Sequence, residues 1–402
     1  MNQRRFVLWM VVPLVIALGA GCATSNKSIT ANDAPISVPA SSILSQPTPS
    51  LQQYLEKGGD PNATNGSGMT LLMQAAFERN LDDAKLLVAH GADVNLGMQL
   101  EHGWWTPLST ALHRRPSRRD LKLGALGGLQ DVSISFNDSS LDMAKFLVAK
   151  GADVNAQKSG TSPLLLQTIN TSFSKNDNTL DRVKLLIEGG ANVNATNTSG
   201  ETPFTAAASG RNLAVLQILI DHGTNVHAKD KWGYTALTRA LTSLSPNPDR
   251  YRLIDVVNFL LDKGADVNDA TKDGFTPLMH AITRTNFEIS KLLVDKGADF
   301  NARNAVGSTA LMLAAGWGES EMVKVLLEKG ADVNTANKEG LTPLMFALQW
   351  SRGRTLEDVQ FLLDKGANVN AKNAAGFTPV MIATTNGQSD AVALFKKYGA
   401  KE

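Results

Sequence analysis

Short apolar stretches recur along the chain at the spacing of one helix face, and glycine closes many of them. Ile289 and Leu293 fall on one face of such a stretch, and Gly297 ends it in the left-handed conformation that glycine adopts without penalty. A shorter apolar stretch begins at Thr276 and Pro277, where threonine is a good N-cap and proline needs no amide partner. The pattern predicts pairs of short helices separated by turns.

The paired pattern repeats about every 33 residues from residue 51 onward. The string Gly-Ala-Asp-Val-Asn, or a near copy, begins at Gly58, Gly91, Gly151, Gly190, Gly223, Gly264, Gly297, Gly330 and Gly366, and Gly-Ala occurs again at Gly399. Between these strings lies Gly-x-Thr-Pro-Leu or a variant, whose Thr-equivalent residues are Thr70, Thr106, Ser162, Thr202, Thr235, Thr276, Thr309, Thr342 and Thr378. One such unit cannot bury its apolar face alone, so stacking of neighbours must supply the core.

This pattern resembles ankyrin repeats, whose period is 33 residues and whose first helix opens on Thr-Pro-Leu-His. The resemblance covers residues 51–402 and implies an all-α solenoid of helix pairs with β-turn or hairpin fingers, elongated and curved. We expect a half-repeat over residues 50–58 and about nine repeats after it. Methionine often replaces the family's histidine, as at Met279 and Met312, and we expect it to fill space without a ligand role.

Four repeats carry insertions in the turn between their paired helices. The largest lies at about residues 114–139 and contains a group of four arginines: Arg114, Arg115, Arg118 and Arg119. It could be a docking loop for an anionic group or an acidic partner. Alternatively, it is a solvated loop, which a fold tolerates because loop entropy grows only as the logarithm of length.

Large apolar residues recur at equivalent places in the repeats. Trp317 and Trp350 each follow their repeat's Thr by eight residues, whereas other aromatic residues lie in the turns between repeats. In ankyrin proteins these positions face the concave side and vary with the partner. The expected partner-binding residues are therefore Trp104, Trp105, Trp232, Tyr234, Phe275, Trp317, Leu341, Trp350 and Phe377. Exposed aromatic residues are favoured as interface hot spots, but these could instead pack on neighbouring turns and stiffen the array.

The first residues have the features of a targeting segment. Arg4 and Arg5 precede an apolar run of 13 residues, 6–18, which is too short to span a bilayer and favours a secretory signal. The run leads to Leu-Gly-Ala-Gly-Cys at residues 18–22, which resembles a bacterial lipoprotein signal, although glycine stands where that family prefers leucine. The resemblance implies cleavage after residue 21 and acylation of Cys22, including palmitate. An ordinary secretory signal with an incidental cysteine is the alternative.

The residues after the cysteine predict a tether and a destination. Residues 23–49 are rich in Ser, Pro and Thr, a composition that favours a flexible linker between Cys22 and a repeat domain over 50–402. The residue directly after the cysteine is Ala23 rather than Asp. By resemblance to Gram-negative lipoproteins, this implies a lipid-anchored protein of the outer membrane, which we expect to face the periplasm.

The composition of the chain disfavours several classes of function. The 39 Lys and Arg residues nearly balance 38 Asp and Glu, and a net charge of +1 disfavours bulk attraction to nucleic acid. Six scattered histidines and one cysteine predict neither a metal site nor an intrachain disulfide. No catalytic signature stands out, so we expect no enzymatic activity and no cofactor.

These observations favour a monomeric, lipid-anchored scaffold that binds a protein partner of unknown identity in the cell envelope. One alternative is an immunity or inhibitor protein that neutralises a toxin or hydrolase in the periplasm. Another is a structural component that organises the envelope. An ankyrin effector exported into a host cell fits poorly, because a lipid anchor would retain it. Repeat folds host many partners, so the fold alone does not choose between these functions.

Overall fold

The computed structural model describes residues 50–65, 68–100, 103–112, 139–158, 160–170, 178–243, 250–350 and 355–401, all within the compact unit Ala40–Glu402. The predicted signal segment, Cys22 and the tether lie outside the described residues. So do the four arginines of the large insertion.

A single helix, α1 (Leu51–Glu56), is followed by helices that come in pairs. The pairs are α2 (Leu71–Glu78) with α3 (Leu81–Ala89), α4 (Pro107–Leu112) with α5 (Ser139–Ala149), α6 (Leu164–Asn170) with α7 (Thr179–Glu188), α8 (Pro203–Ser209) with α9 (Leu213–Asp221), α10 (Ala236–Thr242) with α11 (Arg250–Asp262), α12 (Pro277–Thr283) with α13 (Phe287–Asp295), α14 (Ala310–Trp317) with α15 (Ser320–Glu328), α16 (Pro343–Trp350) with α17 (Thr355–Asp364), and α18 (Pro379–Thr385) with α19 (Ser389–Lys397).

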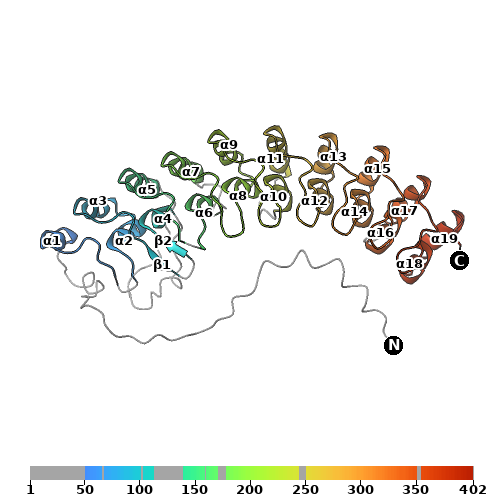
Figure 1. Ribbon diagram of the computed structural model, residues 1–402, viewed down its shortest axis with the longest axis horizontal. Coiled ribbons are helices and arrows are strands. Elements are labelled where there is room, and N and C mark those ends of the chain that lie inside the picture. Colours follow the sequence, from blue (N-terminus) through green and yellow to red (C-terminus); the bar gives the residue numbers. More distant parts are fainter. Residues whose placement is uncertain are drawn as a thin grey trace, which may run out of the picture. The chain divides into compact units, whose positions relative to one another are not determined.

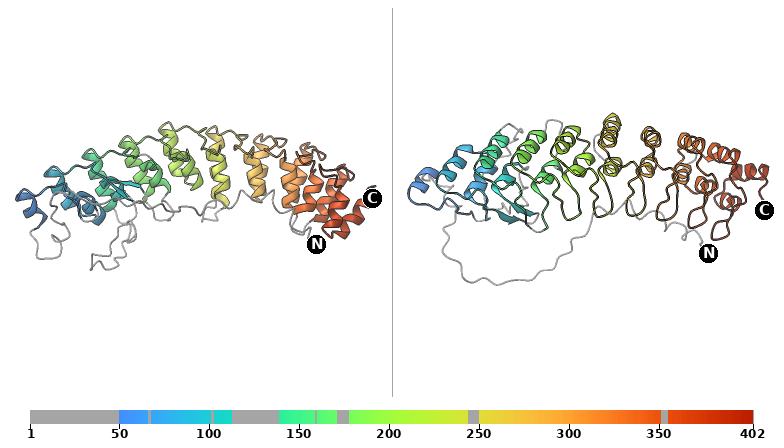
Figure 2. Two further views of the ribbon diagram at one scale, coloured as in Figure 1. Left: turned by 60° about the horizontal axis from the view of Figure 1, so that its bottom comes forward. Right: turned by 45° about the horizontal axis from the view of Figure 1, so that its top comes forward.

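Within this unit the first helices of the pairs form one row and the second helices form another (Figure 1). Each first helix contacts the second helix of its pair, and most helices also contact the equivalent helix of the next pair, as in the run from α12 through α14 to α16. Figure 2 shows the stacked pairs from two further sides. Two short strands, β1 (Met98–Leu100) and β2 (Gly103–Trp105), pair antiparallel before α4. The predicted all-α solenoid of helix pairs is confirmed.

The first helices begin at the repeated threonines, as the sequence predicts. The side chain of Thr276 accepts a hydrogen bond from the backbone amide of Met279 at 3.3 Å, which satisfies one of the free amides at the helix start. Where threonine replaces the family's histidine, it adds a reciprocal bond. The amide of Thr202 donates to the hydroxyl of Thr205 at 2.9 Å, and the amide of Thr205 donates back at 3.1 Å.

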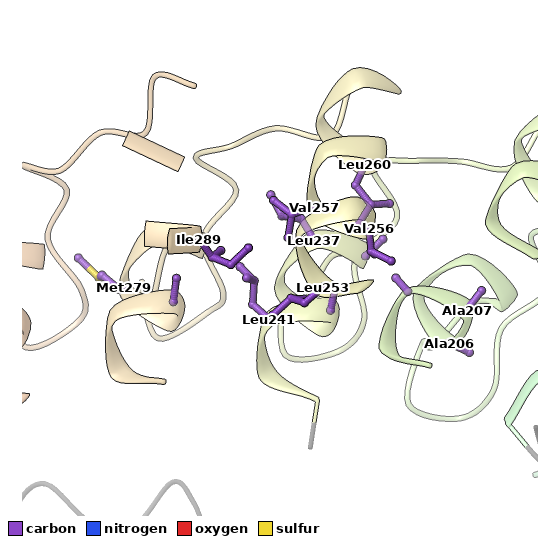
Figure 3. Close-up of a cluster of buried hydrophobic side chains, with 14 of the residues drawn as sticks. Ala206, Ala207, Leu237, Leu241, Leu253, Val256, Val257, Leu260, Met279 and Ile289 are labelled. Carbon is purple, nitrogen blue, oxygen red and sulfur yellow. The ribbon is translucent and has the colours of Figure 1, made fainter. Parts of the chain in front are cut away.

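One continuous apolar cluster extends through the stacked pairs from Leu55 to Phe395. Figure 3 shows its central part, where Leu241 of α10, Val257 of α11 and Ile289 of α13 belong to one cluster. Four of the five methionines at the family's histidine position are at most 1% exposed; they are Met73, Met279, Met312 and Met345. These four pack in the core as predicted, whereas Met381 in the last helix pair is 46% exposed.

The asparagine of the Gly-Ala-Asp-Val-Asn string joins most of these loops to the next loop. Asn155 accepts the amide of Asn192 at 2.9 Å and donates to the carbonyl of Gly190 at 2.9 Å. The same two bonds are made by Asn95, Asn194, Asn268, Asn334 and Asn370. In the loop after α9 this position holds His227, which is exposed and lacks the amide that makes both bonds. Asn301 keeps the amide, but no such bond is present between it and the next loop in the described residues.

The turn before each first helix forms a short hairpin, which we call a finger. Neighbouring fingers are tied by backbone hydrogen bonds: the amide of Lys272 donates to the carbonyl of Trp232 at 2.9 Å, and that of Ala305 donates to Asp273 at 2.8 Å. Gly274 makes this approach possible, since its φ is +77° and a Cβ there would lie 2.8 Å from the Cα of Asn304. The fingers therefore hold their tips in fixed register along the array.

Candidate partner-binding surface

The predicted binding residues fall into two groups at opposite ends of the first helices. The first group precedes these helices, in the fingers and β2; it comprises Trp104, Trp105, Trp232, Tyr234, Phe275, Leu341 and Phe377. The second comprises Trp317 and Trp350, the last residues of α14 and α16. A helix of eight residues is about 12 Å long, so the two groups form separate rows rather than one stripe. The side chain of Trp350 lies outside the described part of the structure.

Trp104 and Trp105 pack against their own chain. Trp105 lies on a cluster of methionines formed by Met69, Met73 and Met98. Trp104 covers Gly97, where a Cβ would lie 2.7 Å from the Cε2 atom of the indole, and the Nζ atom of Lys158 lies 3.6 Å from its ring centroid. The self-packing alternative therefore accounts for these two residues.

Leu341 is 5% exposed and belongs to the continuous apolar core. Its side chain is covered by its neighbours and offers little surface to a partner, so its contact with a partner stays a prediction. Phe377 holds the same position in the last described finger, on which no further finger packs, and is 45% exposed. Exposure at this position therefore depends on whether another finger stacks over it.

Two predicted tryptophans are strongly exposed: Trp232 at 54% and Trp317 at 50%. The place of Trp232 is taken in other fingers by Ser199, Asp273, Val306, Glu339 and Ala375. The place of Trp317 is taken in other repeats by Glu78, Gly210, Ser243, Arg284 and Asn386. The fold therefore requires a large aromatic residue at neither position.

Trp232 is held on a rigid support. Its amide donates to the Oδ1 atom of Asp230 at 2.9 Å, and its carbonyl accepts the finger bond from Lys272. The guanidinium carbon of Arg239 lies 6.0 Å from the Trp232 ring centroid and 4.6 Å from that of Tyr234. Arg239 is fixed in turn by an ion pair with Asp230, whose side chain is 1% exposed. The backbone of Trp232 is therefore already ordered before a partner binds, so little of its conformational entropy is lost on association.

A buried histidine continues this cluster into the next repeat. The ring of His280 in α12 lies 5.7 Å from that of Tyr234 and 5.4 Å from that of Phe275, centroid to centroid. Burial lowers the pKa of His280 to about 4; the nearby Asp273 opposes this shift and Arg284 adds to it. The imidazole is therefore neutral at neutral pH, and its Nε2 atom is buried without a hydrogen-bond partner.

Sequence reasoning treated the histidines as scattered and missed this cluster. A signal was nevertheless present in the repeat alignment. The helix position of His280 is occupied by Arg239 in the preceding repeat and by the apolar Leu313 and Phe346 in the two repeats after it. The same column holds Gln74 and Thr110 in the first two repeats, so what distinguishes these two repeats is that their polar residues are ionisable.

The described part of the chain contains no group of three His, Cys, Asp or Glu side chains that could hold a metal ion. Within the same residues, no helix is both long and apolar enough to cross a membrane.

Comparison with known proteins agrees with the architecture. A model of three successive ankyrin repeats matches residues 171–270, 249–337, 301–373 and 332–402, and a single-repeat model matches 67–97. The chain is also similar to ankyrin repeat protein FPV222 of fowlpox virus (strain NVSL), with 32% identity over 133 residues. That match covers 31% of this chain and only 17% of the viral protein.

Ankyrin repeats are scaffolds for protein–protein interaction and are generally non-catalytic. The family models cover more than half of the residues, and the helix pairs, fingers and threonine caps are those expected for such repeats. The chain belongs to the ankyrin repeat family.

Proposed function

We propose that this protein is a lipid-anchored scaffold of the bacterial envelope that captures a protein partner on its fingers and first helices. The observation that carries the proposal is the exposure of Trp232 and Trp317, each about half open to solvent at a position where the fold needs no large residue. Exposed tryptophan is costly in water and is enriched among the residues that dominate binding energy.

The rigid setting of Trp232 supports the same function. An anchor held by Asp230 and Arg239 is already ordered before binding, so less entropy is lost on association. Trp317 ends α14 next to Gly318, whose left-handed conformation closes the helix. The two residues give a partner one anchor in the fingers, before the first helices, and one at the far ends of these helices.

The lipid anchor rests on the sequence. Cys22 follows an apolar run and small residues, as in bacterial lipoproteins, and the polar segment 23–49 has the composition of a tether. Several acyl chains on one residue would hold the protein stably, since each buried CH₂ contributes about 0.8 kcal/mol. We propose that the anchor lies in the outer membrane of a Gram-negative cell and that the repeats face the periplasm.

The binding surface is tested by replacing the exposed tryptophans with small residues, as Trp232→Ser and Trp317→Ala. The affinity for a partner captured from envelope extracts is expected to fall about thirtyfold or more for each change that removes a buried contact, since truncation of a hot spot costs about 2 kcal/mol. The thermal midpoint should change little. Titration calorimetry and thermal denaturation measure the two quantities on the same samples.

Trp105→Ala is the matched control. Its indole packs on the methionine cluster, so this variant should lose stability and keep its affinity per folded molecule. If Trp232→Ser and Trp317→Ala behave like this control, with a lower midpoint and an unchanged affinity, the proposed surface is wrong.

The anchor is tested by Cys22→Ser. This variant is expected to lose labelling by a fatty-acid probe and to leave the membrane fraction, because the chain contains one cysteine and therefore one thiol for acylation. Fractionation after a salt wash checks the result. Retention of the variant in washed membranes would contradict lipid anchoring.

A further inference from the structure

The fingers around Trp232 carry an uneven distribution of charge. We call Lys231, Trp232 and Lys272 the Trp232 patch. Lys231 precedes the tryptophan in the chain, and the amide of Lys272 is hydrogen-bonded to the tryptophan carbonyl from the neighbouring finger. Two lysines therefore branch from the backbone beside the exposed indole, and both are exposed.

Both lysines of the patch are available to a ligand. Lys231 and Lys272 make no ion pair within the described residues, whereas Lys229 in the same finger is paired with Asp269 at 2.7 Å. Asp273 follows Lys272 and keeps its negative charge, although its Oδ1 atom accepts a hydrogen bond from the hydroxyl of Thr271. Among the described residues, two unpaired lysines beside this one carboxylate leave the finger tips with a small net positive charge.

The two fingers and the start of α10 carry a small excess of positive charge, with four cations and three carboxylates. The cations are Lys229, Lys231, Arg239 and Lys272, and the carboxylates are Asp230, Asp269 and Asp273. Lys229 is paired with Asp269 and Arg239 with Asp230, so in this described region the unpaired cations are the two lysines of the patch. His280 adds no positive charge at neutral pH, because its pKa lies near 4. A local excess of positive charge attracts anionic groups within about 10 Å, even though the whole chain is nearly neutral.

We propose that the Trp232 patch binds an acidic peptide segment of the partner, with one large apolar side chain on the indole and carboxylates at Lys231 and Lys272. This inference rests on the proposed function and specifies the chemistry of the ligand. An acidic peptide suits the patch because its carboxylates complement the two lysines while its apolar side chain covers the indole. A nucleic acid fits less well, because it would need a longer track of cations than two free lysines provide.

The test uses the full chain and a displayed library of random 12-residue peptides. Selected peptides are expected to be enriched in Asp and Glu and to contain at least one Trp, Phe or Leu. The double variant Lys231→Glu/Lys272→Glu should bind these peptides at least tenfold more weakly at low salt, and the difference should shrink as salt is added. The control Lys145→Glu/Lys184→Glu changes two exposed lysines of the second helices and should bind like the unchanged protein.

Two results would overturn the inference. One is selection of neutral or basic peptides, or of none; the other is equal binding of the acidic peptides by the charge-reversed variant. A single-stranded oligothymidylate that displaced them at equal concentration would point to nucleic acid and overturn it as well. If Trp232→Ser abolishes partner capture but charge reversal does not, the acidic ligand is wrong while the proposed surface stands.

Discussion

Gly274→Ala is expected to lower the free energy of unfolding by about 3 kcal/mol or more. The residue has φ +77°, and a Cβ would lie 2.8 Å from the Cα of Asn304 and 2.9 Å from the amide nitrogen of Ala305. Those atoms are backbone, so relief requires the two fingers to move apart and weakens the hydrogen bond between Asp273 and Ala305. Urea denaturation followed by circular dichroism measures the loss.

Gly376→Ala separates the two causes of this loss. Gly376 has φ +82°, nearly the same conformation, but nothing lies within 4 Å of a Cβ built there. In Gly376→Ala only the backbone strain remains, so we expect the free energy of unfolding to fall by about 1 kcal/mol. If the free energy of unfolding fell equally in the two variants, the close approach of the two fingers at Gly274 would add nothing to the effect of backbone strain.

The protein is expected to lose about 2 kcal/mol of stability between pH 7 and pH 4.5 through His280. Its pKa is about 4 in the folded protein against an ordinary value of 6.5, because the imidazole is buried between Tyr234 and Phe275. In this range the unfolded chain binds the proton more readily than the folded one. Stability therefore falls as the pH falls from 6.5 toward 4.

The variant His280→Leu isolates this contribution. Leucine stands at the same helix position in the next repeat, Leu313, and is 9% exposed there, so the substitution suits the site. The other titrating groups are common to both proteins and cancel when the two stabilities are subtracted. We expect that difference to change by about 2 kcal/mol between pH 7 and pH 4.5. A difference independent of pH would contradict a buried neutral imidazole.

The helix pairs were predictable because the chemistry that defines them is local. Thr276 caps its helix through an amide three residues away, and Gly297 takes the left-handed conformation that ends the second helix of the pair. The repeat period then fixes which elements stack. Met279 and Met312 were predicted as packing residues because a stacked array leaves an unbranched apolar side chain no other role there.

The surface was only partly predictable, since exposure at one position depends on the repeats around it. Leu341 and Phe377 occupy the same place in their fingers, yet one is 5% exposed and the other 45%. Trp105 is drawn into the methionine cluster by a finger that is longer than its neighbours. The sequence shows that a large apolar residue is present at these positions, but whether its side chain is covered depends on other turns of the solenoid.

The replacement of asparagine by His227 has a consequence for how the array deforms. In a chain of nearest-neighbour contacts, bending and partial opening concentrate at joints with fewer bonds, and in the described residues the loops of His227 and Asn301 both lack the asparagine bonds to the next loop. Opposite His227 the same joint is bridged by Trp232, Tyr234, Arg239 and His280, together with the finger bond to Lys272. A ligand bound to those fingers would contact the repeats on both sides of the joint. Binding would therefore also restrict bending of the solenoid at this point.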